Sequence, residues 1–316
     1  MNCPPTDLSS MALVELGQLL RESDYSFTAV TPETYRRNNT RADRGQARSL
    51  RDVFGWNRPF ARELLPPRVA FLLEQAGALG TSGDLLLSRV RYSTLGGNLF
   101  AHSAYPTVEE ASVFFGPDSY RFAAFVTAEL SAEPPPDGSR IIDVGCGTGV
   151  GGFVAGQLVQ ASTVVLADIN ARALAYAEVN ATLAAFDRAE FVESDIFSRV
   201  PGTFDVVLSN PPYMVDSLAR AYRDGGAQNG AELSLRILEE SLSRLTSGGR
   251  LLLYTGTAVI SGRDVFLERA QPILAAAGVR YRYREIDPDV FSEELEEPAY
   301  ADVERIAAVS LVAYAS

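Results

Sequence analysis

The chain has 316 residues, of which 47% are hydrophobic and 22% charged, a balance typical of a folded globular protein and not of a disordered or fibrous one. Two cysteines and one histidine, His102, argue against a disulfide framework, a histidine- or cysteine-based metal centre and a Ser-His-Asp triad. No stretch approaches the roughly 18 uncharged apolar residues of a membrane-spanning helix, and the net charge of −12 disfavours nucleic-acid binding over the whole surface. We expect a cytoplasmic protein without membrane contact, whose chemistry needs neither a metal ion nor a histidine base.

The first third of the chain combines helices with a pair of strands. Helical spacing of apolar residues predicts helices over residues 8–22, from about Thr31 onward, and over residues 66–78. Residues 85–92 and 98–103 have strand patterns and are separated by the turn Leu95-Gly96-Gly97. These elements suggest a small, winged-helix-like α+β domain over residues 1–107 that recognises or docks a substrate. His102 falls in the second strand, where we expect a structural role.

The N-terminal third also contains a stretch that is rich in arginine. Every basic residue of the chain is arginine, and nine of them lie between residues 36 and 68 with only three acids, which makes that stretch net +6. The nine are Arg36, Arg37, Arg41, Arg44, Arg48, Arg51, Arg58, Arg62 and Arg68. The stretch is either a solvated helical surface or a docking face for an anionic partner, since arginine binds phosphate and carboxylate with paired donors.

After the proline-rich break at residues 133–138, strand and helix patterns alternate to the end of the chain. Strands are predicted over residues 141–144, 163–167, 190–192, 204–209, 250–254, 279–283 and 307–313. Helices are predicted over residues 150–160, 171–185, 231–246 and 262–277. Such alternation builds a mostly parallel sheet covered by helices on both faces. We therefore assign residues 108–316 to a single α/β catalytic domain.

A glycine loop follows the first of these strands. Asp143 ends the strand, and Gly145, Cys146, Gly147, Thr148 and Gly149 form the turn that opens the next helix. Glycines let the backbone approach a ligand closely, and a dinucleotide site is the obvious rival interpretation. The spacing is G-x-G-x-G and not G-x-G-x-x-G, and an acid precedes it. This combination fits the charged amino-acid part of a ligand better than a pyrophosphate.

Two further acids follow the next two strands. Asp168 ends the second strand, where a carboxylate can bind both hydroxyls of a ribose. Asp195 follows the third strand and could accept a hydrogen bond from an adenine amino group, with Ile196 covering the ring. Because ligands bind at the carboxyl ends of parallel strands, acids at three successive strand ends indicate a nucleoside site.

The fourth strand, residues 204–209, runs directly into Asn210-Pro211-Pro212-Tyr213. A planar NH₂ group is a poor nucleophile because its nitrogen lone pair is delocalised. Acceptors on Asn210 and Pro211 would favour a tetrahedral nitrogen and bind it more strongly as it becomes positive, so they act in the transition state. Tyr213 would stack on the planar group and orient it. The tetrad, with Pro212 included, is the predicted catalytic site.

Taken together, the glycine loop, Asp168, Asp195 and the tetrad resemble the class I S-adenosylmethionine-dependent methyltransferase superfamily across residues 108–316. The resemblance implies the sheet order 3-2-1-4-5-7-6 with an antiparallel last strand, and S-adenosylmethionine as the cofactor. It also implies that residues 115–120 lie over the methionine end of that cofactor. The implied cofactor contacts are Phe115, Tyr120, Asp143, Gly145, Cys146, Gly147, Gly149, Asp168, Ile169, Asp195, Ile196 and Asn210.

The tetrad is shared by two branches of this superfamily, HemK-like glutamine N5-methyltransferases and N6-adenine methyltransferases. A glycine-containing segment from Tyr222 to Glu232 and the small N-terminal domain resemble the HemK-like layout. Tyr254-Thr255-Gly256 departs from it, because that family usually has a glutamate before the glycine. Ile196 also stands where an aromatic residue is common.

The implied substrate is first a glutamine amide of a release factor or ribosomal protein, and alternatively an adenine of rRNA, tRNA or DNA. A small-molecule substrate and a non-catalytic cofactor-binding adaptor stay open as further alternatives.

The acidic segment between the last two strands bears on the same choice. Residues 284–305 contain nine acids. We interpret residues 285–304 as a solvated loop, with positioning of a basic partner as the alternative. Because an acidic surface repels a bare nucleic acid, this segment favours a protein substrate, whereas the arginine-rich stretch favours an anionic one.

Overall fold

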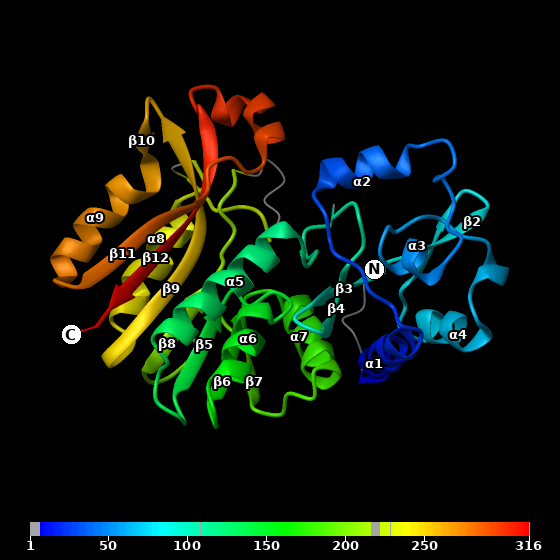
Figure 1. Ribbon diagram of the computed structural model, residues 1–316, viewed down its shortest axis with the longest axis horizontal. Helices are drawn as coiled ribbons and strands as arrows, with labels where there is room; N and C mark the ends of the chain where they lie inside the picture. The colour runs from blue at the N-terminus through cyan, green and yellow to red at the C-terminus, as the bar shows by residue number, and fades with distance from the viewer. Residues whose placement is uncertain (1–6, 108, 216–221, 228, 316) are drawn as a thin grey trace. The chain divides into compact units, whose positions relative to one another are not determined.

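The computed structural model describes residues 7–107, 109–215, 222–227 and 229–315 (Figure 1). The chain forms two compact units. The first, here called the N-terminal unit, contains the chain through Arg121 together with residues 147–149 and 171–187. The second, here called the sheet unit, contains residues 122–146, 150–170 and 188–316. No helix of the described residues is long and apolar enough to cross a membrane.

The sheet unit is built on one mixed sheet, with strands in the order β7-β6-β5-β8-β9-β12-β11. The strands are β5 (Arg140–Val144), β6 (Thr163–Asp168), β7 (Ala189–Glu193), β8 (Phe204–Ser209), β9 (Leu245–Ile260), β11 (Arg280–Asp287) and β12 (Arg305–Tyr314). The short β10 (Arg263–Asp264) pairs with β9 outside this order. Neighbours from β7 to β9 are parallel, and β12 is antiparallel to both of its neighbours. The predicted order 3-2-1-4-5-7-6 with an antiparallel last strand is confirmed.

Helices pack on this sheet through apolar residues. They are α5 (Pro117–Ala132), which begins in the N-terminal unit, α6 (Val150–Leu158), α8 (Glu232–Leu242) and α9 (Val265–Ala277). Helix α6 packs on β5 and β6, and α8 and α9 pack on β9. Helix α9 begins where the Asp264 side chain accepts a hydrogen bond from the Leu267 amide, and it ends at Gly278, whose φ of 62° suits glycine. Helix α5 was not among the predicted helices, because its apolar residues do not form one clear stripe.

Four helices and two hairpins make up most of the N-terminal unit. They are α1 (Asp7–Glu22), α2 (Pro32–Asn39), α3 (Leu50–Phe54), α4 (Pro67–Gln75), β1 (Leu79–Ser82), β2 (Leu85–Ser88), β3 (Val90–Leu95) and β4 (Asn98–Ser103). A 3₁₀ turn covers Arg62–Leu64, and helix α7 (Ala171–Leu183) also belongs to this unit. The mixed content agrees with the predicted small α+β domain. Its division from the catalytic domain at residue 107 stays a prediction.

One predicted strand of this unit was wrong in its extent. Residues 85–92 form two strands, because the chain bends at Arg89, directly after Ser88, and leaves β2 paired with β1 while β3 pairs with β4. The Ser88 hydroxyl donates to the Val90 carbonyl (2.6 Å) and accepts from the Val90 amide (3.2 Å). These local bonds replace the strand pairing that a continuous strand would need. The β3–β4 hairpin itself has the predicted turn at residues 95–97.

Helix α7 packs against α1 and β4 within the N-terminal unit. At the contact with α1, a Cβ atom on Gly17 would lie 2.8 Å from Leu183 Cδ2, so the glycine leaves room for the Leu183 side chain. The buried Asn180 side chain accepts from the Ala101 amide of β4 (2.7 Å) and donates to the carbonyls of Ala101 and Thr148 (3.1 Å each). One amide therefore serves three buried backbone groups.

His102 lies fully buried in β4. Its Nε2 lies 2.8 Å from the Ser93 hydroxyl, and its ring stacks on Phe115 with centroids 5.2 Å apart. Burial and the nearby Arg91 lower the pKa of His102 well below its usual value. The ring is therefore neutral and enclosed, as a structural role requires.

The Asn180 contacts generate a stability prediction. We expect Asn180→Ala to lower the free energy of unfolding by about 2–4 kcal/mol, because buried backbone donors and acceptors lose their partner. Urea denaturation followed by circular dichroism measures this change. Thr182→Ala is the matched control on the same helix, since that exposed hydroxyl donates to the Glu178 carbonyl of its own helix. Equal midpoints for the two variants would contradict the proposed importance of the Asn180 contacts.

Candidate functional site

The predicted site residues of the sheet unit follow the ends of three neighbouring parallel strands. In the sheet, Val144 of β5 is paired with Ala167 of β6 on one side and with Ser209 of β8 on the other. The Ser209 hydroxyl also donates to the Val144 carbonyl (2.7 Å). The glycine loop, Asp168 and Asn210 therefore leave the sheet at the same edge, as the sequence analysis expected of ligand-binding residues.

The glycine loop bends back over the end of β6. The amides of Gly145 and Cys146 both donate to the Ala167 carbonyl, at 2.8 and 3.0 Å. Gly145, Gly147 and Gly149 have φ of 68°, 54° and 83°, a backbone conformation that other residues rarely adopt. Burial, with the nearby Asp168 and Asp143, raises the pKa of the Cys146 thiol well above its usual value. The cysteine is therefore a buried neutral part of the turn.

Asp143 lies beneath the start of α6 and is 1% exposed. Its Oδ2 accepts a hydrogen bond from the Gly152 amide (2.8 Å), and a Cβ atom on Gly151 would lie 2.8 Å from the same oxygen. Burial raises the pKa of Asp143 to about 7, with a further increase from the negative charge of Asp168, against the opposing effect of the Gly152 hydrogen bond. A cation placed beside this carboxyl would restore its charge.

Asp168 is the half-buried last residue of β6, and the exposed Ile169 follows it. The Asp168 Oδ1 accepts from the Asn170 amide (2.8 Å), and its backbone carbonyl accepts from the Ser194 amide (3.0 Å). These bonds fix both the side chain and the turn after β7. Ile169 is 64% exposed, which makes it a large apolar side chain beside a carboxylate at the ligand edge of the sheet.

The turn after β7 holds Asp195 and Ile196 in different surroundings. Asp195 is exposed, and one of its oxygens lies 3.5 Å from Arg236. Ile196 is 6% exposed, and its side chain belongs to the apolar core of the sheet unit. Its φ of 49° is an unusual conformation for a β-branched residue, and such strained positions cluster at functional sites. The ring-covering role of Ile196 stays a prediction.

Tyr213 of the tetrad is held by close packing against backbone. Asn210 is half-buried directly after β8, and Tyr213 is 7% exposed. A Cβ atom on Gly256 of β9 would lie 2.1 Å from Tyr213 Cδ2, so the ring lies directly on the backbone of that glycine. The role of Gly256 was not predicted from the sequence, because the contact joins two separate strands. The neighbouring Thr255, at the departure from the HemK-like pattern, is fully buried and lies 2.7 Å from the Ser234 hydroxyl.

The glycine segment after the tetrad packs on Tyr213 from another direction. A Cβ atom on Gly230 would lie 2.2 Å from the Tyr213 carbonyl oxygen, and one on Gly225 would lie 2.7 Å from the Tyr213 Cα. The Met214 amide donates to the Arg223 carbonyl (3.1 Å), and the Gly225 amide donates to the Met214 carbonyl (2.7 Å). The segment predicted from the resemblance thus contacts the backbone of the tetrad directly.

The acidic segment between β11 and β12 also contacts the tetrad region. The Phe291 ring lies 6.1 Å from the Tyr213 ring, and the Tyr300 hydroxyl accepts from the Val215 amide (2.7 Å). Glu294 forms an ion pair with Arg223 in which both side chains are largely buried. Several acids of the segment are exposed, but it is not a plain loop, because it contains the 3₁₀ helices Ser292–Glu296 and Pro298–Tyr300. The contacts of Phe291 and Tyr300 were not predicted. Two isolated aromatic residues among acids were the available signal.

Phe115 and Tyr120, the remaining predicted cofactor contacts, belong to the N-terminal unit. Phe115 is 1% exposed and packs on Phe100, while the Tyr120 hydroxyl accepts from the Ala29 amide (3.0 Å). Their predicted contact with a cofactor stays a prediction.

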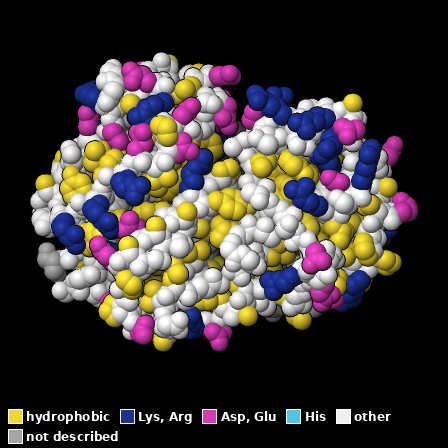
Figure 2. All heavy atoms as spheres, in the orientation of Figure 1, with side chains coloured by type: hydrophobic (Ala, Val, Ile, Leu, Met, Phe, Trp, Pro, Cys, Tyr) yellow, Lys and Arg dark blue, Asp and Glu magenta, His cyan; other side chains and the backbone are white. Residues whose placement is uncertain are grey.

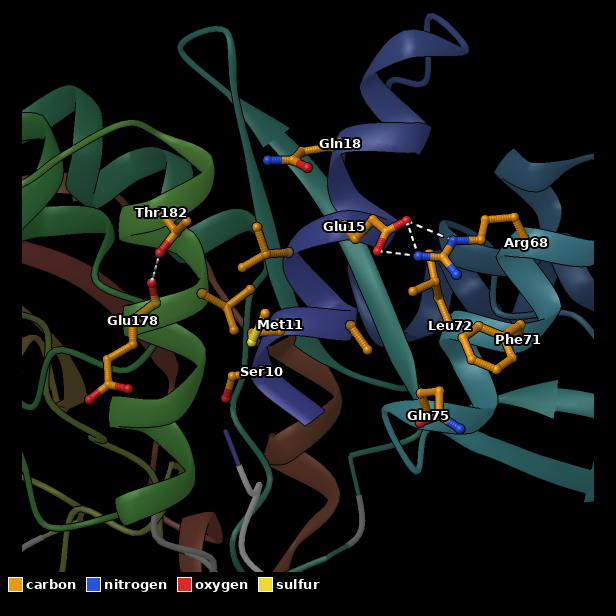
Figure 3. Close-up of a pocket in the computed structure, with 13 residues that line it drawn as sticks. Ser10, Met11, Glu15, Gln18, Arg68, Phe71, Leu72, Gln75, Glu178 and Thr182 are labelled. Atoms are coloured by element: carbon orange, nitrogen blue, oxygen red, sulfur yellow. Dashed lines mark hydrogen bonds and ion pairs between the residues drawn. The ribbon is translucent and has the colours of Figure 1, made fainter. Parts of the chain in front are cut away.

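A cavity of about 650 Å³ lies elsewhere, between α1, α4 and α7 of the N-terminal unit (Figure 3). Apolar side chains such as Leu72 and Val179 line it together with the Glu15–Arg68 ion pair. None of the predicted site residues lines this cavity.

The central part of the chain is similar to known methyltransferases. Residues 121–259 match the family model described as Methyltransferase small domain. A release factor glutamine methyltransferase of Rhodopirellula baltica is 31% identical over 142 residues, covering 40% of this chain and 47% of the relative. A ribosomal RNA small subunit methyltransferase C of Pasteurella multocida is 41% identical over 95 residues, covering 30% of this chain and 28% of the relative. The chain thus spans about half or less of these relatives.

The fold agrees with that of a distant solved structure. Trm5b of Pyrococcus abyssi superposes with a TM-score of 0.51 at 16% identity, covering 75% of this chain and 62% of that one. This likeness concerns the fold alone. The family match over residues 121–259, the strand order and the site motifs agree with one another: the central part of the chain is similar to class I S-adenosylmethionine-dependent methyltransferases and carries the Asn-Pro-Pro-Tyr tetrad.

Proposed function

We propose that this protein is an S-adenosylmethionine-dependent N-methyltransferase that acts on a planar NH₂ group. The observation that carries the proposal is the position of Asn210–Tyr213 directly after β8, beside the strand end that opens the glycine loop. Tyr213 is fixed there by the backbones of Gly225, Gly230 and Gly256. A fixed Tyr213 ring, together with the hydrogen-bond acceptors of Asn210 and Pro211, suits a substrate with a planar NH₂ group.

The residues at the strand ends fit the chemical parts of S-adenosylmethionine. The Asp168 carboxylate would bind the ribose hydroxyls, and the exposed Ile169 offers an apolar surface to the adenine, with Asp195 accepting from its amino group. The buried Asp143 carboxyl would support the ammonium of the methionine part, directly or through water. When bound, this cofactor supplies an electrophilic methyl group on a sulfonium.

The tetrad would prepare the substrate nitrogen. The Asn210 side-chain oxygen and the Pro211 carbonyl accept hydrogen bonds from the NH₂ group, and Tyr213 stacks on its planar surroundings. As the nitrogen lone pair forms its bond to the methyl carbon, the sulfur–methyl bond would break and leave its electron pair on the sulfur. The nitrogen then becomes positive and both hydrogen bonds strengthen. The surplus proton then leaves to water, so the chain needs no dedicated base.

The first candidate substrate is the side-chain amide of a glutamine in a protein of the translation machinery. One relative is named as a release factor glutamine methyltransferase. The acidic segment supports this choice, because Phe291 and Glu294 bring it against the tetrad region. Its exposed acids would repel a bare nucleic acid near the tetrad and attract a basic protein.

The second candidate is the amino group of a base in RNA. Other relatives are named as ribosomal RNA small subunit methyltransferases. The arginine-rich stretch of the N-terminal unit favours it, since it offers donors to phosphate.

A methyl-transfer experiment distinguishes these substrates. Tritiated methyl from S-adenosylmethionine is transferred by the purified chain into a lysate of cells that lack this protein, and the product is digested with protease or with nuclease. We expect protein-bound label that protease releases as small fragments. Label released only by nuclease would reverse the order of the two candidates, and the absence of macromolecular label in both digests would contradict both.

Asn210→Ala should separate catalysis from cofactor binding. We expect turnover to fall by about 10²-fold or more while the Kd for S-adenosylmethionine stays within about twofold, because Asn210 is assigned to the transition state. Isothermal titration and the labelling assay measure the two quantities. Asp168→Ala is the contrasting variant, expected to weaken cofactor binding. Unchanged turnover in Asn210→Ala would remove that residue from the mechanism.

The raised pKa of Asp143 predicts how stability depends on pH. Since the folded state holds this proton up to a pH of about 7 and the unfolded state releases it near 3.8, raising the pH between these values disfavours folding. Relative to Asp143→Asn, the wild-type free energy of unfolding should fall by up to about 1.4 kcal/mol per pH unit in this window. Urea titrations at several pH values measure the difference. Parallel curves of unfolding free energy against pH for the two proteins would show that Asp143 has an ordinary pKa.

A further inference from the structure

The nine arginines of residues 36–68 fall into three groups that differ in burial and in ion pairing. Arg58 is buried, pairs with Asp52 at 2.5 Å and binds the side chains of Asn38 and Asn39. Arg62 and Arg68 are exposed but paired with acids of helices, Glu74 of α4 and Glu15 of α1, at 2.5 Å each. The remaining six lie on or between α2 and α3. They are Arg36, Arg37, Arg41, Arg44, Arg48 and Arg51, here called the arginine surface.

The acids near the arginine surface do not neutralise it. Glu33 alone accepts bonds from both Arg36 and Arg37, and these bonds lower its pKa to about 2. Asp43 lies 3.4 Å from Arg44, and Asp52 is already paired with the buried Arg58. Six arginines against the two carboxylates Glu33 and Asp43 leave a net charge of +4 on a chain whose total charge is −12.

Several arginines of this surface have guanidinium N–H groups that can donate hydrogen bonds to a partner. Among the described residues, no hydrogen bond or ion pair is found for the guanidinium groups of Arg41 and Arg48, and both residues are exposed. Arg51 lies over the Phe27 ring at 5.2 Å and donates to the Ser26 carbonyl, and within the described parts of the chain no ion pair with a carboxylate is found for it. Dark-blue side chains gather over the part of the N-terminal unit that holds α2 (Figure 2).

The backbone beneath the arginine surface is held in place. The Thr31 hydroxyl caps α2, and the Ser49 hydroxyl caps α3. Between them, the Ala47 amide donates to the Pro59 carbonyl (2.8 Å), and the Asn39 side chain donates to the Trp56 carbonyl (2.9 Å). A fixed backbone reduces the conformational entropy that binding must overcome.

We propose that the arginine surface binds the phosphate backbone of RNA. Guanidinium groups bind phosphate through paired donors and stack on unpaired bases, so a cluster of arginines with a net positive charge suits RNA. An acidic protein is the other anionic partner, but protein interfaces have an apolar or aromatic core. Within the described residues, the exposed large apolar side chains are Met11, Phe71, Leu158, Ile169 and Tyr281, and none of these belongs to the arginine surface.

This RNA-binding role goes beyond methyl transfer and does not depend on it. It concerns residues of the N-terminal unit, whereas the proposed catalytic residues lie in the sheet unit. An assay that contains no methyl donor therefore tests it separately. A chain that fails to methylate any substrate can still bind RNA, and the reverse also holds.

The test is fluorescence anisotropy of a fluorescein-labelled RNA hairpin of mixed sequence with the full chain. We expect the affinity to fall with salt, with a slope of log affinity against log salt of about −3 to −4. The double variant Arg41→Glu/Arg48→Glu should reduce the size of this slope by about 1 to 2 and weaken binding by tenfold or more at about 0.1 M salt.

Arg62→Glu/Arg68→Glu is the matched control. It makes the same change of charge in the same stretch, outside the arginine surface, and we expect RNA binding within about twofold of wild type. Circular dichroism verifies that both variants are folded. Equal losses in the two variants would overturn the assignment to this surface. Stronger binding of fluorescein-labelled polyglutamate than of the hairpin would overturn RNA as the partner.

Discussion

The position of the tetrad depends on the absence of side chains around Tyr213. Its ring lies on the backbone of Gly256, and its own backbone contacts Gly225 and Gly230. A Cβ atom at any of these three positions would lie within 2.7 Å of a Tyr213 atom or of neighbouring backbone, which is closer than real Cβ contacts allow. Three separate points of the chain thus leave room for one aromatic residue, and the substrate position that Tyr213 defines is correspondingly fixed.

This packing explains which parts of the site the sequence predicted and which it did not. The tetrad and the glycine loop could be found because each is a continuous run placed directly after a strand. Gly256, Phe291 and Tyr300 could not, because each meets the tetrad region only when β9 and the segment before β12 are brought beside β8. The acidic composition of residues 285–304 gave no indication of the buried contacts of this segment, since acids usually indicate solvated loops.

The same distinction holds for the fold. Strands of the sheet were predicted because long apolar runs are typical of strands buried on both faces, and their order followed from the resemblance. The β1–β2 hairpin was missed because the chain bends at Arg89, directly after Ser88, inside what reads as one strand. Helix α7 was predicted correctly as a helix, yet its packing on α1 and β4 rests on Gly17 and Asn180. Neither residue carries a signal of that role in its local sequence.

The arginine-rich stretch shows most clearly how the fold determines the charge that a surface presents. In the sequence, nine arginines give one stretch a net charge of +6. In the structure, their roles differ according to which acids the fold brings near them. Arg58 is removed from the surface by Asp52, and Arg62 and Arg68 are paired with Glu74 and Glu15 from elsewhere in the unit. The charge that is left is smaller but concentrated on α2 and the residues leading into α3. A strongly acidic chain can therefore present one basic surface, and long-range repulsion by its other faces would favour approach of a polyanion to that surface alone.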